Sequence, residues 1–355
     1  MTNSNESNSA SKDELLQQMS EIQGEKLDNK RVWKSIAQIG LKEGLSPESK
    51  DTVLICAGLG RTGTSSLKLA LKKIGLTPYH MSDGVMETKG HMDLWVDNAA
   101  LPALEAYPPL TTTDISDNGD RKARAKTLMA NYGFDAQGEG IGKVIQGIAD
   151  AGFDSATDMP ACYLWLALAK AHPNAKVVLT RRESGEEWAE SVLKTIGQNI
   201  PLFSKSPFTL MKPMKLALKL NHWMWAGIGV PADLWHTDDW SVKGELGQSL
   251  AVSHDTWSDV VREEYRNLRG GKEEVVEILA KDGVENWKKL RDLLEESSYK
   301  EKCQLMVDSG EPWPFENEAA EMKKIYGILN SLVTVWKVLP FGLIALLTAA
   351  VYFWL

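Results

Sequence analysis

Short apolar runs recur along the chain, and stretches with apolar residues at helical spacing follow them. Val53 to Ala57 is continuously apolar and Lys176 to Thr180 has an apolar centre, which is typical of strands buried in a parallel sheet. Leu76 to Met81 and Phe153 to Asp158 predict further strands. Because helical patterns separate these runs, we expect an α/β fold with a central parallel sheet and helices on both of its faces.

The predicted helices share apolar residues three and four positions apart. They cover Leu27 to Glu43, Ser65 to Ile74, Met86 to Leu104, Ile141 to Ile148, Ala161 to Ala171, Glu186 to Ile196, His254 to Leu268 and Asn286 to Glu296. A last strand is expected at Glu274 to Leu279. The prolines and tryptophans between about 200 and 243 predict an inserted lid, with an ordinary packed helix pair as the alternative.

The two ends of the chain differ in character. Residues 1–25 are polar and predict a disordered tail, without the apolar core of a signal peptide. Val338 to Leu355 carries no charge and is apolar on every face, and lysines precede it. This pattern predicts a transmembrane helix within 330–355, which would anchor the domain at 26–329 to a membrane with its catalytic face toward the cytosol.

Charge and cysteine content exclude some functions. The formal net charge of −8 argues against non-specific nucleic-acid binding, which needs a basic surface. Cys56, Cys162 and Cys303 lie far apart and show no paired spacing. We therefore expect neither a zinc site nor a disulfide framework, and no bound metal.

The stretch VLICAGLGRTGTSSLKLAL, from Val53 to Leu71, places a glycine-rich loop between a buried strand and a helix. Such a junction directs backbone N–H groups at one point, where the helix dipole adds positive charge. Gly60 and Gly63 would let a ligand approach the backbone closely. The loop predicts a bound phosphate or related oxyanion, without selecting one.

Three interpretations of this loop are open. Gly58, Gly60 and Gly63 spell the dinucleotide motif G-x-G-x-x-G, and Asp83 lies where a ribose ligand would be expected. The loop also nearly spells the phosphate loop of nucleotide triphosphatases, but Thr64 stands in place of its lysine. The third interpretation rests on the arginine and the hydroxyl side chains in and next to the loop. These are Arg61, Thr62, Thr64, Ser65 and Ser66.

An arginine before the last glycine, with Thr and Ser after it, resembles the 5′-phosphosulfate loop of sulfotransferases. Several blocks of the sequence resemble, in the same order, those of the P-loop sulfotransferase-like family of bacteria, fungi and algae. These blocks are AGLGRTGTSSLKLAL with PYHM, GHMDLW, FDSATDMPACYLWLALAKAHPNAKVVLTRRESGEEWAESV and GEPWPFEN. The resemblance runs with gaps from about Thr52 to Asn317. It implies a three-layer P-loop fold and 3′-phosphoadenosine 5′-phosphosulfate as co-substrate.

The resemblance also assigns cofactor-binding residues. Arg61 would neutralise the bridging oxygen of the leaving phosphate, while Thr64 and Ser65 would donate to the 5′-phosphate with the Gly63 and Thr64 amides. The 3′-phosphate would be held by Arg182, which ends a strand, and by Ser191 on the next helix, although ESGEEW is one residue longer than the shortest family version. LRGGK, from Leu268 to Lys272, could close over that phosphate or form a turn.

A base would take the proton of the acceptor. Asp158 and Pro160 fit the family's Asp-x-Pro block, and partial burial would raise the pKa of Asp158. Asp158 could instead cap the helix from Ala161. His80, which ends the second predicted strand, could be the base or could bond the loop.

The sequence as a whole predicts a sulfotransferase that moves a sulfuryl group from 3′-phosphoadenosine 5′-phosphosulfate to a hydroxyl or amine acceptor. The acceptor is expected to be a small molecule or a lipid, and the membrane anchor and the tryptophan-rich segment suggest a lipid, sterol or other amphiphile. A homodimer could form, and no nucleic-acid partner is expected. The alternatives are a catalytically silent, membrane-tethered nucleotide-binding module and an NAD-binding oxidoreductase.

Overall fold

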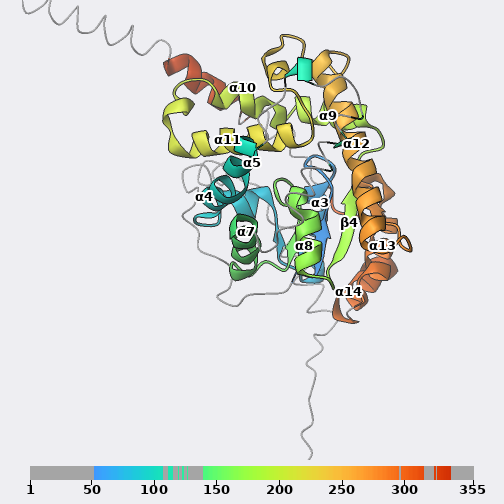
Figure 1. Ribbon diagram of the computed structural model, residues 1–355. Helices are drawn as coiled ribbons and strands as arrows, with labels where there is room; N and C mark the ends of the chain where they lie inside the picture. The colour runs from blue at the N-terminus through green and yellow to red at the C-terminus, as the bar shows by residue number, and fades with distance from the viewer. Residues whose placement is uncertain are drawn as a thin grey trace, which may run out of the picture. The chain divides into compact units, whose positions relative to one another are not determined.

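The fold is built on one sheet of five parallel strands in the order β2-β3-β1-β4-β5 (Figure 1). The computed structural model describes residues 52–106, 111–114, 119, 122–123, 126, 139–295, 297–315, 324 and 326–336. The strands are β1 (Leu54–Cys56), β2 (Pro78–Tyr79), β3 (Ser155–Ala156), β4 (Lys176–Thr180) and β5 (Val276–Ile278). The predicted α/β class with a central parallel sheet is confirmed. The predicted tail at 1–25 and helix at 27–43 lie outside the described residues.

The register of the sheet brings distant segments together. Leu54 of β1 pairs with Ser155 on one side and with Lys176 on the other. Thr180, at the end of β4, pairs with Ile278 of β5. In a parallel sheet the carboxyl ends of the strands share one edge, where ligands bind. The segments that follow β1, β3 and β4 therefore meet at that edge.

Helices connect the strands and pack against them. The longer ones are α3 (Thr64–Ile74), α7 (Glu139–Asp150), α8 (Trp165–Ala171), α9 (Gly185–Leu193), α11 (Lys212–Gly227), α12 (Glu245–Leu268), α13 (Val284–Leu293) and α14 (Ser297–Asp308). The short ones are α4 (His91–Trp95), α5 (Leu101–Ala106) and α10 (Asn199–Phe203). Single turns of 3₁₀ or π type are η1 (Met81–Met86), η2 (Val96–Ala100), η3 (Thr112–Asp114), η4 (Ala161–Leu164), η5 (Ile196–Gln198), η6 (Phe208–Leu210), η7 (Asp233–His236) and η8 (Ala280–Asp282).

The segment predicted as an inserted lid contains α10 and α11. Its residues Trp223, Trp225 and Trp235 are buried in the hydrophobic core. The hydroxyl of Tyr163, which precedes α8, donates to the Met224 carbonyl at 2.9 Å. The segment is thus packed into the core, as the alternative of an ordinary packed helix pair predicts. That it opens as a lid stays a prediction.

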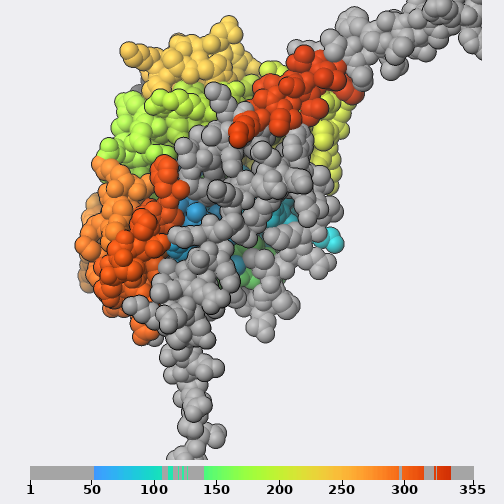
Figure 2. Space-filling model, turned by 180° about the vertical axis from the view of Figure 1, so that it is seen from behind, coloured from blue at the N-terminus to red at the C-terminus, as the bar shows by residue number. Residues whose placement is uncertain are grey.

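Residues 326–336 form a helix whose inner side carries the buried Tyr326, Leu329 and Val333. The Tyr326 hydroxyl donates to Asn199 Oδ1 of α10 at 2.7 Å. Figure 2 shows this helix in red on the same face of the molecule as the orange α14.

The prediction of a C-terminal transmembrane helix is corrected. No helix among the described residues has the length and the apolar character that crossing a membrane requires. The stretch 338–355, on which that prediction rested, lies outside the described residues. Among the described residues the fold class is α/β, and they give no support to the expected transmembrane helix or to the expected membrane-anchored location with a cytosol-facing domain.

Candidate anion-binding site

The glycine-rich loop lies between β1 and α3 and is packed tightly against the end of β4. A Cβ on Gly58 would lie 2.1 Å from Thr180 Oγ1 and 2.2 Å from the Thr180 carbonyl oxygen, so only glycine fits there. Two buried indoles fix the backbone of the same loop. Trp257 of α12 donates to the Ala57 carbonyl at 2.8 Å, and Trp188 of α9 donates to the Gly60 carbonyl at 2.7 Å.

The hydroxyl of Thr62 is buried against the loop backbone and the end of β4. Its Oγ1 donates to the Leu59 carbonyl at 2.5 Å and lies 2.6 Å from Thr180 Oγ1, and the residue is 1% exposed. Thr62 was predicted to bind the cofactor, but its hydroxyl closes the loop on itself and bonds it to β4.

The N-terminus of α3 begins at the loop's last glycine. Gly63 has a φ of 98°, in the left-handed region that favours glycine, and is the N-cap residue of α3. As a glycine it makes no side-chain cap bond, and the first turn of α3 carries no acidic residue. Thr64, Ser65 and Ser66 supply its buried hydroxyls. These features are those of an anion-binding helix end.

Two arginines and a serine that were predicted from separate segments meet beside the loop. Arg61 has a φ of 69°, and its Nε donates to Ser191 Oγ of α9 at 3.4 Å. Arg182, just after β4, donates from Nε to the Arg61 carbonyl at 2.9 Å. Ser191 reaches the loop despite the extra residue in ESGEEW. The structure thus brings together the groups expected to hold the two phosphates.

Asp158 and His80 lie on the other side of the loop. Thr64 Oγ1 donates to Asp158 Oδ1 at 3.1 Å, and His80 Nε2 lies 3.3 Å from Asp158 Oδ2. Asp158 has a φ of 70°, and a Cβ on Gly60 would lie 2.9 Å from its Oδ1. The N-cap of the following turn is Pro160 and has no side-chain cap bond. The carboxylate therefore faces the loop and does not cap the helix.

Both ring nitrogens of His80 have polar neighbours. The Ser82 backbone amide donates to His80 Nδ1 at 3.3 Å. His80 Nδ1 also lies 3.1 Å from Ser82 Oγ, and which of these two atoms donates depends on the tautomer of the ring. His80 is 4% exposed. Its Nε2 is the ring nitrogen on the Asp158 side, 3.3 Å from Oδ2, and the two groups form an ion pair when the ring is protonated.

Asp83, the ribose ligand of the dinucleotide interpretation, is engaged by helix α3. Its carboxylate lies 2.9 Å from Lys72 Nζ and 3.5 Å from Lys68 Nζ, and it accepts from Ser82 Oγ at 2.8 Å. Burial raises the pKa of Asp83, but the charges of Lys68, Lys72 and His80 outweigh it and hold the pKa well below its usual range. Asp83 thus links η1 to α3.

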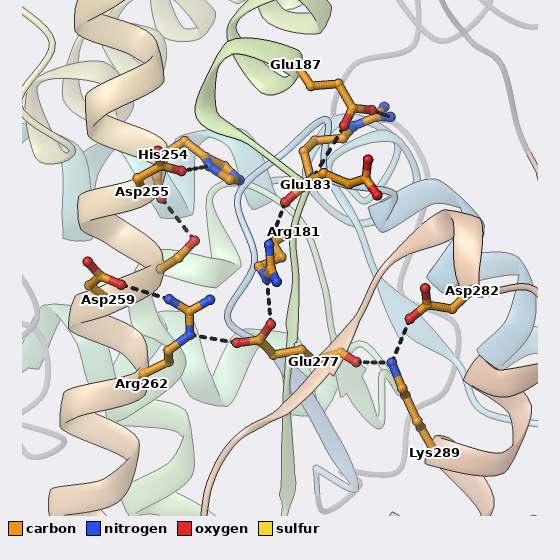
Figure 3. A network of polar contacts seen from close by, with 12 residues as sticks. Arg181, Glu183, Glu187, His254, Asp255, Asp259, Arg262, Glu277, Asp282 and Lys289 are labelled. Atoms are coloured by element: carbon orange, nitrogen blue, oxygen red, sulfur yellow. Dashed lines mark hydrogen bonds and ion pairs between the residues drawn. The ribbon is translucent and has the colours of Figure 1, made fainter.

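Arg181, in contrast to Arg182, turns away from the loop toward β5 (Figure 3). Glu277 of β5 accepts from Arg181 Nε at 2.5 Å and from Arg262 Nε of α12 at 2.6 Å. Partial burial raises the pKa of Glu277, but these hydrogen bonds outweigh it and the pKa is lowered. Arg181 Nη1 also donates to the Arg182 carbonyl at 3.0 Å. The first arginine of the pair therefore fixes the strand end.

The LRGGK segment forms the turn that ends α12. Gly270 and Gly271 have φ values of 66° and 79°, and the Gly271 amide donates to the Arg266 carbonyl at 2.7 Å. This geometry is that of a helix C-terminal turn, the second of the two interpretations. Arg269 Nη2 of this segment donates to the Ala175 carbonyl at 3.3 Å, just before β4 begins and so at the opposite end of that strand from the loop.

Several residues at the site were not predicted from the sequence. One of them is Trp188 of α9, whose buried indole holds the loop through the Gly60 carbonyl. Glu187 Oε1 accepts from Arg182 Nη1 at 2.9 Å. Burial raises the pKa of Tyr326, and the charge of Arg61 acts in the opposite direction, which places this tyrosine in the electrostatic environment of the loop. Only the S-x-x-E spacing of Ser184 and Glu187, a capping signal, marked any of them in the sequence.

Comparison with known proteins agrees with this geometry. The family model described as sulfotransferase domain matches residues 53–322. A curated relative, Ava biosynthesis cluster protein M of Aspergillus versicolor, is 35% identical over 149 residues, which are 40% of this chain and 42% of that protein. The match thus spans less than half of the relative. The resemblance predicted from the motifs is confirmed, and because the family model covers most of the chain, the protein belongs to the sulfotransferase domain family.

Proposed function

We propose that the protein transfers a sulfuryl group from 3′-phosphoadenosine 5′-phosphosulfate to a hydroxyl or amine acceptor. The observation that carries this proposal is the meeting of Arg61, Arg182 and Ser191 on one side of the loop, with the hydrogen-bonded Asp158 on the other. Cations and an uncapped helix N-terminus suit an anionic donor. A carboxylate that a hydroxyl hydrogen-bonds suits the activation of an acceptor.

The two arginines would act on different parts of the donor. Arg61 follows Gly60 in the loop, so its guanidinium would lie by the 5′-phosphosulfate and stabilise the negative charge that gathers on the leaving oxygen. Arg182, whose Nε is held by the Arg61 carbonyl, would bind the 3′-phosphate with Ser191. The planar fork of arginine suits phosphate oxygens. The donor itself supplies the activated sulfuryl group.

Asp158 would accept the proton of the acceptor, and His80 would hold the Asp158 carboxylate in position. The Thr64 hydroxyl donates to one carboxylate oxygen at 3.1 Å, and His80 Nε2 lies 3.3 Å from the other. These two contacts fix the rotation of the carboxylate. His80 is the alternative base, because its ring lies next to the same group.

Calorimetric titration of the full chain without magnesium tests the donor. We expect 3′-phosphoadenosine 5′-phosphate to bind more tightly than NAD or ATP. A preference for NAD would favour the oxidoreductase, and no binding by the folded protein would overturn the proposal.

A screen of alcohols and amines with labelled sulfate donor then tests transfer. Binding without transfer to any of them would favour the silent module.

Two substitutions test the residues. Arg61→Ala and Asp158→Asn should each lower turnover by about 10²-fold or more, because each removes a charge at the reacting atoms. Asp150→Asn, at the exposed end of α7, makes the same change of charge away from the loop and should keep wild-type turnover. Wild-type turnover in Arg61→Ala or Asp158→Asn would refute that residue's role.

A further inference from the structure

Arg182 is in contact with a carboxylate as well as with the loop. Its Nη1 donates to Glu187 Oε1 at 2.9 Å, while its Nε donates to the Arg61 carbonyl at 2.9 Å. We propose that Glu187 is a competing anion built into the 3′-phosphate subsite, and that it limits the affinity for the bisphosphate product. This inference rests on the proposed function, because it takes Arg182 as the ligand of the 3′-phosphate.

The other charges at this strand end are engaged elsewhere. Figure 3 shows Arg181 directed toward Glu277, and Glu187 on the opposite side of Arg181. Glu183 pairs with Lys281, just beyond β5. Arg181 and Glu183 thus contact β5 and the residue just beyond it, whereas Arg182 contacts the loop and Glu187. Within the described part of the chain, Glu187 is the carboxylate that contacts Arg182.

The position of Glu187 is fixed by the start of α9. Ser184 is the N-cap residue, and its Oγ accepts from the Glu187 amide at 3.2 Å. Glu187 Oε2 in turn accepts from the Glu183 amide at 3.3 Å. This is close to a capping box, in which the third helical residue returns a hydrogen bond to the chain before the helix. The helix start thereby holds Glu187 next to Arg182.

The contact is nevertheless open to exchange. The Glu187 side chain is 44% exposed and that of Arg182 is 28% exposed, so water reaches both groups. An arriving phosphate must share the guanidinium with the carboxylate or displace it into solvent. The bisphosphate keeps its 3′-phosphate after the sulfuryl group has left, so the same competition acts on product release, a step that often limits turnover.

Glu187→Gln separates the charge from the capping role. The amide oxygen of Gln can still accept from Arg182 and from the Glu183 amide, but the negative charge is lost. Partly exposed ion pairs are worth up to about fivefold in an equilibrium constant. We expect Glu187→Gln to bind 3′-phosphoadenosine 5′-phosphate about fivefold more tightly than the wild type, with slower dissociation. Its affinity for adenosine 5′-phosphate, which lacks the 3′-phosphate, should not change.

Glu186→Gln is the matched control, because it removes the same charge one residue earlier in the same helical turn. Its affinities should equal those of the wild type. Titration of the full chain and its two variants with both nucleotides gives the comparison, and thermal unfolding checks that each is folded.

Unchanged or weaker bisphosphate binding in Glu187→Gln would overturn the role of Glu187. An equal gain in Glu186→Gln would do the same, because it would reveal a general effect of charge. A wild type that does not prefer the bisphosphate over the monophosphate would overturn the assignment of Arg182 and the inference with it.

Discussion

Gly58→Ala tests the contact between the glycine-rich loop and the end of β4. The new Cβ would lie 2.1 Å from Thr180 Oγ1, 2.2 Å from its carbonyl oxygen and 2.7 Å from its amide nitrogen. Real Cβ atoms essentially never come closer than 3.0 Å to another atom, and two of these three atoms are backbone. The loop or the strand end must therefore move by about 1 Å, which cannot be avoided by turning a side chain.

The displacement should cost both stability and affinity. Overpacking in a well-packed core costs about 1–3 kcal/mol. Thr180 directly precedes Arg181 and Arg182, so the same movement shifts the second arginine away from Arg61. A misplacement of about 1 Å can cost about 10²-fold in a positioned site. We expect Gly58→Ala to lower the free energy of unfolding by about 1–3 kcal/mol and to weaken binding of 3′-phosphoadenosine 5′-phosphate by one to two orders of magnitude.

Urea unfolding followed by tryptophan fluorescence measures the first effect, and calorimetric titration measures the second. Gly327→Ala is the control, because its Cβ would meet no atom within 4 Å and the residue lies in a helix. There the change should be neutral or stabilise by up to about 1 kcal/mol. A Gly58→Ala protein with the urea midpoint and affinity of the wild type would refute the packing argument.

Two further predictions concern buried polar groups. Thr62→Val should lower the free energy of unfolding by about 1–3 kcal/mol in urea, because it leaves the Leu59 carbonyl and the Thr180 hydroxyl without this partner; a wild-type midpoint would contradict this. Burial lowers the pKa of His91 to about 4, so the unfolded chain, with an ordinary histidine pKa of about 6.5, binds the proton first as the pH falls. The contribution of His91 to the free energy of unfolding should therefore be complete above about pH 6.5 and decrease toward pH 4. Between pH 7 and pH 5, the free energy of unfolding should fall less in His91→Gln than in the wild type; an equal fall would count against the lowered pKa of His91.

The strands were predictable where the apolar run is continuous. β1 and β4 appear within the predicted runs, because strands buried on both faces need apolar residues at successive positions. The runs at 76–81 and 153–158 shrink to two residues each, β2 and β3, since the residues that follow them leave the sheet at its ligand-binding edge. The π-helical turn at Met81–Met86 had no signal in the periodicity.

The candidate site was predictable as a set of residues but not as a set of contacts. Arg61, Arg182 and Ser191 were each marked by a local motif, and the fold brings them together. The hydrogen bond between Thr62 and Thr180, however, joins positions 118 residues apart, and a motif does not specify such a partner. Likewise the left-handed backbone of Asp158 decides that its carboxylate faces the loop, and no feature of its neighbours in sequence indicates that.

The order of the sheet has a consequence for how the chain folds during synthesis. β1 and β2 are not neighbours, because β3 lies between them, so Leu54 has no partner strand until Ser155 has been made. At about 5–20 residues per second, this takes roughly 5–20 s. The loop closes later still, since Thr180 and Ser191 must also have emerged from the ribosome. The apolar strand β1, whose three residues are all buried in the folded protein, therefore spends that time unpaired in the nascent chain.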